Sequence, residues 1–233
     1  MARPHYIAIK EHIIEHIDDK RWLAGERVPS ENELAQAFAV SRMTARRALQ
    51  ELCEQGILVR SQGLGSFVAD NRPMSSILTV KSIDEEIAAR GHSHRAEILL
   101  LESQRAAAGT AQLLGLQEGA EVFRSILLHW ENKQPLQYEE RFVNPRFGAD
   151  YLKQDFTRIT PSHYLSGTSP ITEADQTIEA VNASADICKA LRIKRSEPCL
   201  KLSRRTWCKR GIVNVADLIF PGSRYRLGGH LNF

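Results

Sequence analysis

Residues 29–52 read PSENELAQAFAVSRMTARRALQEL, and this stretch decides the fold of the first part of the chain. Ser30 and Glu33 have the spacing of a capping box, in which the hydroxyl accepts a backbone N–H and the carboxylate reaches back to the cap. Ser41 stands where a second N-cap is expected, shortly after the apolar residues of the first helix. The stretch therefore predicts two short helices joined by a tight turn.

The second of these helices has an apolar face and a cationic face. Its apolar residues recur at i, i+3, i+4 and i+7, which predicts that they face a core: Ala45, Ala48, Leu49 and Leu52. The first turn also has unpaired backbone N–H groups and the positive end of the helix dipole, and both favour phosphate. The polar residues available to a nucleic acid are Ser41, Arg42, Thr44, Arg46 and Arg47.

A β-hairpin is predicted directly after this helix pair. Residues 57–60 and 66–68 read as two short strands, and the glycine-containing turn between them has Gln62 and Gly63 at its tip. Residues 4–19, in front of the pair, read as one more helix. A helix-turn-helix followed by such a wing is typical of DNA-binding proteins, with the wing tip able to approach the minor groove or the phosphate backbone.

Charge balance alone does not predict DNA binding. The chain of 233 residues has a formal net charge of only +3, and residues 1–70 carry nine Lys/Arg against ten Asp/Glu, a balance of −1. The prediction therefore depends on where the cations lie. Hydrophobic content of 42% and charged content of 25% are those of an ordinary globular protein.

No targeting or membrane segment is visible in the sequence. No apolar run approaches the roughly 18 residues of a membrane span. The first residues lack a secretory signal, so we expect a cytoplasmic protein. The four cysteines have no paired spacing and are expected to be free thiols.

Residues 5–69 resemble the winged helix-turn-helix of the GntR family of bacterial transcription regulators. The family pattern of Pro, Ser or Ala, Glu-x-x-Leu-Ala, then Ser-Arg-x-Thr-x-Arg-x-Ala-Leu-x-x-Leu and Gly-x-Ile is matched from Pro29 to Ile57. The resemblance implies a homodimer on a near-palindromic operator. It implies operator contacts from Arg42, Thr44 and Arg46, supported by Glu31 or Asn32 and by Gln62 and Gly63.

The chain length and a polar, proline-containing segment predict two domains. We expect a DNA-binding domain over residues 1–69, a linker over 70–76 and a second domain over 77–233. A shift of about 77 residues superimposes residues 114–143 on 191–220, with Trp130 falling on Trp207. Both copies read helix, strand, turn, strand. A duplicated unit of this kind predicts an α+β domain in which one antiparallel sheet has helices on a face and a cleft between its halves.

The second domain offers polar residues for a ligand but no catalytic motif. The return strand of the first copy alternates Gln137, Glu139 and Arg141 with Tyr138, Glu140 and Phe142, so one face is polar. Neither a GxSxG nor an HExxH motif nor a phosphate-binding loop occurs, and no enzyme is expected. The histidine pairs 12/16 and 92/94 are weak metal candidates, so neither a metal nor a cofactor is expected.

Residues 77–233 resemble the UTRA effector-binding domain of the HutC branch of the GntR family, which has a chorismate-lyase-like fold. The motifs are residues 88–91, 135–145, Ser162-x-Tyr164 and Arg224-Tyr225. The resemblance implies a ligand pocket with Glu139, Ser162, Tyr164 and Tyr225. Charge logic adds Arg141 as the partner of a ligand carboxylate.

Leu127 and His129 stand where members that sense sugar phosphates carry two arginines, which argues against a phosphate ligand. His129 suits a smaller anion with an imidazole ring. Residues 138–145, 177–181 and 221–227 resemble the branch members that control histidine degradation. The resemblance implies a repressor of histidine-utilization genes that urocanate releases from DNA. The alternative is a repressor that senses another metabolite, such as a sugar phosphate.

Overall fold

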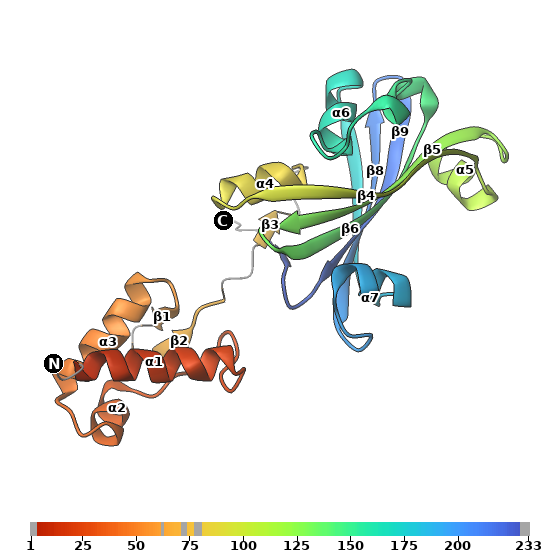
Figure 1. The fold of residues 1–233 in the computed structure, drawn as a ribbon. Helices are drawn as coiled ribbons and strands as arrows, with labels where there is room; N and C mark the ends of the chain where they lie inside the picture. Colours follow the sequence, from red (N-terminus) through yellow and green to blue (C-terminus); the bar gives the residue numbers. More distant parts are fainter. Residues whose placement is uncertain (1–3, 62, 71–73, 77–80, 229–233) are drawn as a thin grey trace. The chain divides into compact units, whose positions relative to one another are not determined.

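The computed structural model describes residues 4–61, 63–70, 74–76 and 81–228 (Figure 1). The chain forms two compact units, Met1–Asn71 and Arg72–Phe233. Of the expected linker over 70–76, positions 71–73 lie outside the described residues, and Met74–Ser76 form the short strand β3. In the part of the chain that is described, no helix is long and apolar enough to cross a membrane.

The first unit contains three helices and a two-stranded hairpin, in the order that the sequence predicts. Its elements are α1 (His5–Asp18), α2 (Glu31–Ala37), α3 (Arg42–Glu54), β1 (Leu58–Ser61) and β2 (Gly65–Val68). The capping box of α2 is confirmed, because Ser30 Oγ accepts from Glu33 N at 3.3 Å and Glu33 Oε2 accepts from Ser30 N at 2.7 Å. Ser41 caps α3 by accepting from Thr44 N at 3.1 Å.

The core of the first unit joins the three helices to the hairpin. The predicted apolar face of α3 is buried and packs with α1, α2 and both strands; its members and their neighbours are Ile9, Ile13, Leu34, Ala45, Ala48, Leu49, Leu52, Leu58 and Val68. This packing leaves the polar faces of α2 and α3 toward solvent, as a helix-turn-helix requires.

The second unit is built on a six-stranded antiparallel sheet, which confirms the α+β prediction. The strands are β4 (His94–Arg105), β5 (Glu121–Glu131), β6 (Gln134–Val143), β7 (Glu173–Asn182), β8 (Pro198–Cys208) and β9 (Gly211–Pro221). They lie in the order β4-β5-β6-β9-β8-β7. A separate parallel pair joins β3 to β10 (Arg226–Gly228).

The helices of the second unit cover both faces of the sheet, whereas the sequence predicted one. The helices are α4 (Ile83–Ala89), α5 (Ala108–Leu114), α6 (Pro161–Thr168) and α7 (Ala185–Leu191), and two short 3-10 helices, η1 (Pro145–Phe147) and η2 (Tyr151–Lys153), follow β6. The face that carries Leu127 and Leu218 is covered by α4, η1, η2 and α6. The other face is covered by α5 and α7, which lie toward opposite ends of the sheet (Figure 1).

The internal repeat is confirmed at the level of whole elements. The segment α5-β5-β6 recurs as α7-β8-β9, and the starts of α5 and α7, residues 108 and 185, differ by 77. Both hairpins have a register shift at equivalent places, between His129 and Trp130 and between Thr206 and Trp207. We call the face that carries Leu127 and Leu218 the inner face. Because β6 and β9 pair in the middle of the sheet, the inner faces of the two copies form one continuous surface.

The four cysteines are free thiols, as expected. Cys188, Cys199 and Cys208 are buried, and Cys53 is half-buried. Burial raises the pKa of the Cys199 thiol, and the neighbouring thiol of Cys188 acts in the same direction.

Replacing Ser30 with alanine is expected to loosen α2 while the chain stays folded. Loss of an N-cap of this kind costs about 1 kcal/mol, which corresponds to roughly fivefold faster amide hydrogen exchange in peptides covering α2. The control is Gln36→Ala, an exposed change on the same helix. Equal exchange rates in Ser30→Ala and wild type would mean that the cap does not stabilise α2.

Candidate functional site

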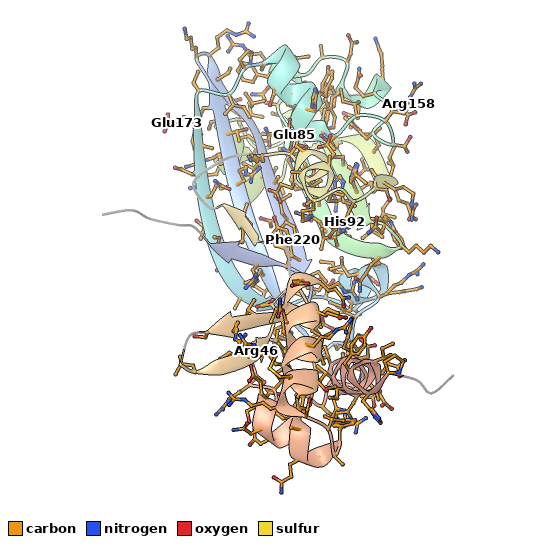
Figure 2. The ribbon with its side chains drawn as sticks, turned by 90° about the vertical axis from the view of Figure 1, so that its left-hand side faces the viewer. Arg46, Glu85, His92, Arg158, Glu173 and Phe220 are labelled. Atoms are coloured by element: carbon orange, nitrogen blue, oxygen red, sulfur yellow. The ribbon has the colours of Figure 1, made fainter. Side chains whose placement is uncertain are left out.

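Helix α3 presents a cationic surface at its start. Arg42 is 69% exposed at its side chain, and Arg46 is exposed one turn later (Figure 2). Ser41 and Thr44 join their hydroxyls at 2.8 Å. The N-terminal turn of α3 thus combines cations and hydroxyls with the positive end of the helix dipole, a combination that suits phosphate and base edges.

Glu31 connects this surface to the hairpin. Its Oε2 accepts from Arg42 Nε at 3.0 Å, and its Oε1 accepts from Arg60 Nη2 at 2.8 Å. Burial alone would raise the pKa of Glu31, but the hydrogen bonds from Arg42 and Arg60 lower it below its ordinary value. One carboxylate therefore holds two exposed guanidinium groups, from α3 and β1, next to each other.

Arg60 was missed by the sequence reasoning, although a cation on the strand that leads to a wing tip was a usable signal.

The remaining residues that the sequence predicted for DNA contact lie at different places in the first unit. Asn32 is exposed on α2, and Gly63 lies at the hairpin tip with a φ of +77°. Gln62 lies outside the described residues. Arg47 points toward α1, because its guanidinium lies 4.0 Å from the centre of the Tyr6 ring and bonds to Glu51.

The inner face of the sheet in the second unit carries a buried row of polar side chains. Glu139 and Arg141 on β6 are 3% and 2% exposed, and Arg141 Nε donates to Glu139 Oε1 at 2.8 Å. The remaining Arg141 nitrogens donate to Asn214 Oδ1 at 2.5 Å and to Ser162 Oγ at 3.0 Å. The guanidinium is thus enclosed by β6, β9 and α6.

Charge in this row is balanced at Glu139. Burial alone would raise the pKa of Glu139, but the charge of Arg141 and the His129 ring hold it well below its usual range. Gln137 Nε2 also donates to Glu139 Oε2, at 3.2 Å. Glu139 is therefore an ionised acceptor inside the domain, a role that only a paired carboxylate can have there.

A pair of histidines continues the row to the sheet edge. His94 Nε2 lies 3.0 Å from His129 Nδ1, and His129 Nε2 lies 3.5 Å from Glu139 Oε2. His129 is completely buried. Burial lowers the pKa of His94 to about 4, and the His129 ring contributes in the same direction. Among the residues described, no group of three or more His, Cys, Asp or Glu side chains is placed to hold a metal ion.

Two adjoining hollows open beside this row. One has a volume of about 380 Å³ and is lined by residues that include Arg141, Ser162 and Asn214. The narrower one is lined by residues that include Glu139, Ser162 and Tyr225. Tyr225 stacks on Phe220 with ring centres 4.0 Å apart and donates to Glu86 Oε2 at 2.7 Å.

The structure thus brings four of the six predicted ligand residues to these hollows: Glu139, Arg141, Ser162 and Tyr225. His129 lines neither hollow, because it lies behind Glu139. Tyr164 lines neither, because its ring packs on Tyr151 and Phe156. Arg204 lines both hollows and was missed by the sequence reasoning. The repeat was a usable signal, since position 204 is 77 residues after Leu127 on the inner face.

Two family models match the two parts of the chain. The model described as bacterial regulatory proteins, gntR family, matches residues 5–68. The model of the UTRA domain matches residues 89–226, which is more than half of the chain.

The chain is also similar to characterised proteins and solved structures. It is 47% identical over 229 residues to the histidine utilization repressor of Pseudomonas putida, covering 98% of this chain and 92% of the relative. The crystal structure of the C-terminal domain of histidine utilization repressor from Pseudomonas syringae pv. tomato str. DC3000 has a TM-score of 0.59 and 46% identity, over 60% of this chain and all of that one. PhnF from Mycobacterium smegmatis shares the fold, with a TM-score of 0.66 and 20% identity over 96% of this chain and 99% of that one.

Acid is expected to destabilise the second unit through His94. The folded pKa of about 4 lies below the ordinary value of 6.5, so the unfolded chain binds the proton more readily. This contribution to stability is complete above about pH 6.5 and is lost as the pH falls toward 4. His94→Gln should therefore lose less Tm than wild type between pH 7 and pH 5, measured by thermal unfolding. The difference in Tm between the two proteins should be constant above pH 7, and parallel Tm curves below pH 6.5 would contradict the assignment.

Proposed function

Because this chain belongs to the GntR family of bacterial regulatory proteins and contains the UTRA domain, we propose that it represses histidine-utilization genes and leaves its operator when urocanate binds. Like its relatives, the chain is a transcriptional repressor and not an enzyme. The observation that carries the finer proposal is its nearly full-length similarity to a histidine utilization repressor. The proposed place of action is the cytoplasm, where bacterial operators lie, with no cofactor.

The proposed DNA complex is a homodimer with one α3 helix in each of two successive major grooves. Arg42 and Arg46 contact guanines or phosphates, and a good bidentate contact to a base contributes about 1–3 kcal/mol of discrimination. Glu31 holds Arg42 and Arg60 in position through the two ion pairs. The supporting contacts come from Asn32, Ser41, Thr44, Gln62 and Gly63, while Arg47 has a peripheral role.

The proposed urocanate site consists of the two hollows beside the buried polar row. The stacked pair of Phe220 and Tyr225 supplies an aromatic wall for a planar ligand. Glu139 supplies an ionised acceptor for an imidazole N–H, and Ser162 supplies a hydroxyl at the boundary of both hollows. His129 lies behind Glu139, with its Nε2 3.5 Å from Glu139 Oε2, and supports that carboxylate without lining the hollows.

A short parallel strand pair connects the ligand site to the segment that leads to the DNA-binding unit. Strand β3 pairs with β10 in the register Met74–Arg226, Ser75–Leu227 and Ser76–Gly228. Tyr225 directly precedes β10, and both Tyr225 and Leu227 line the narrower hollow. A ligand that shifts these side chains acts on β3 through backbone hydrogen bonds. Release from DNA requires that the ligand bind the two states of the repressor with different affinity.

Replacing Arg42 with alanine is expected to weaken specific operator binding by at least tenfold, because one base or phosphate contact is lost. The measurement is a gel-shift titration with the operator region of a histidine-utilization operon and with unrelated DNA of the same length. The control is Lys189→Ala, which removes one exposed cation from the second unit. Unchanged operator affinity in Arg42→Ala would remove this residue from the interface.

Urocanate at millimolar concentration or below is expected to dissociate the wild-type protein from operator DNA. Calorimetry should give heat of binding for urocanate and none for an amino-sugar phosphate. If the sugar phosphate bound and urocanate did not, the effector would be the sugar phosphate and not urocanate. A repressor that neither compound removes from DNA would refute the effector assignment and leave the DNA-binding assignment intact.

A further inference from the structure

We propose that Arg204, on β8, is the residue that holds the anionic group of the small molecule bound by the second unit. The inference rests on the proposed function in so far as that function requires a small effector in the two hollows. It goes further by assigning the charge of the ligand to one side chain that none of the sequence motifs includes.

Arg204 is a buried cation that forms no ion pair with a carboxylate of the described residues. The residue is 8% exposed, and its Nε and Nη2 both donate to one neutral oxygen, Gln176 Oε1, at 3.1 and 3.0 Å. Within the described ranges, no Asp or Glu oxygen lies within 4.0 Å of its nitrogens. Arg141, by contrast, has Glu139 at 2.8 Å. A buried charge is costly unless it is paired, so an anion from outside completes the environment of Arg204.

The acids that surround the hollows already have other partners. Glu139 is paired with Arg141, and Glu86 accepts from the Tyr225 hydroxyl at 2.7 Å. Glu85 accepts from the backbone N–H of Ser82 at 3.4 Å, in the capping box of α4. None of these carboxylates forms an ion pair with Arg204, and Lys81 adds a second cation to the lining of both hollows. The two linings together carry three cations (Lys81, Arg141 and Arg204) and three carboxylates (Glu85, Glu86 and Glu139), so the preference for an anion comes from Arg204 itself and not from the net charge of the hollows.

The position of Arg204 suits contact with a ligand. It is among the residues that line both hollows. Leu202, Leu218 and Phe220 line the narrower hollow and supply apolar contact beside the charge. Burial lowers the pKa of Arg204 to about 10, and the charge of Arg141 acts in the same direction, so the side chain is still a cation at neutral pH. A guanidinium fork matches the two oxygens of a carboxylate.

The repeat supplies an independent comparison. Position 127 is equivalent to position 204, and the first copy has a leucine there that is completely buried in the core. The two copies have the same order of helix and strands, and a register shift at equivalent places follows each position. The backbone therefore accepts an apolar residue at this site, and packing alone does not require an arginine.

The test compares Arg204→Gln with wild type and with the matched control Arg205→Gln. Arg205 is the next residue on β8, and it pairs with Asp175 on the opposite face. The probes are urocanate, its neutral amide, imidazolepropionate and an amino-sugar phosphate, each titrated by calorimetry into the intact protein. Whichever acid binds wild type, we expect Arg204→Gln to lower the affinity for it by about 30-fold or more. The same variant should leave the affinity for the amide nearly unchanged, and Arg205→Gln should behave as wild type.

Thermal unfolding without ligand separates this role from a structural one. If Arg204 is an unpaired buried cation, Arg204→Gln should have a Tm equal to or above that of wild type. Equal affinity of Arg204→Gln and wild type for the acid would overturn the proposal. The proposal would also fail if none of the anions bound to the wild-type protein. If imidazolepropionate or the sugar phosphate binds through Arg204 and urocanate does not, the proposed effector fails while the assignment of Arg204 stands.

Discussion

The buried ion pair between Glu139 and Arg141 is the interaction on which the second unit depends. Two charges in an apolar interior are tolerated only when each is paired and hydrogen-bonded, and removing one partner of such a pair typically costs about 3–5 kcal/mol. The remaining donors of Arg141 bind Asn214 on β9 and Ser162 on α6. One guanidinium therefore links β6 of the first repeat to β9 of the second and to α6.

Duplication of the helix–hairpin segment explains how one domain combines a stable sheet with a buried arginine, Arg204, on the inner face. The two copies have the same order of elements, a register shift at equivalent places and a direct pairing of β6 with β9. They differ in the side chains on the inner face, where Leu127 and His129 of the first copy correspond to Arg204 and Thr206 of the second. A symmetric scaffold thus carries an asymmetric pocket, which a ligand without symmetry requires.

The first unit solves a different electrostatic problem. Its net charge is close to zero, so attraction to DNA depends on the arrangement of a few guanidinium groups and not on their number. Glu31 fulfils this arrangement by holding Arg42 of α3 and Arg60 of β1. The negative charge of Glu31 weakens the attraction to phosphate, but its ion pairs reduce the conformational freedom of two long side chains before DNA is bound.

The sequence by itself determined the elements whose signals are local. Capping boxes, the apolar period of α3, the turn of the hairpin and the repeat all involve residues close in the chain or a fixed offset, so they could be read directly. Only the tertiary structure decided which polar side chains meet: Arg60 beside Arg42, Arg47 turned to Tyr6, His129 behind Glu139, and Arg204 in the lining of both hollows. The residues of these pairs come from different elements or different sides of one element. Their contacts depend on strand order, register and helix docking, which follow from the packing of the whole domain and leave no local pattern in the sequence.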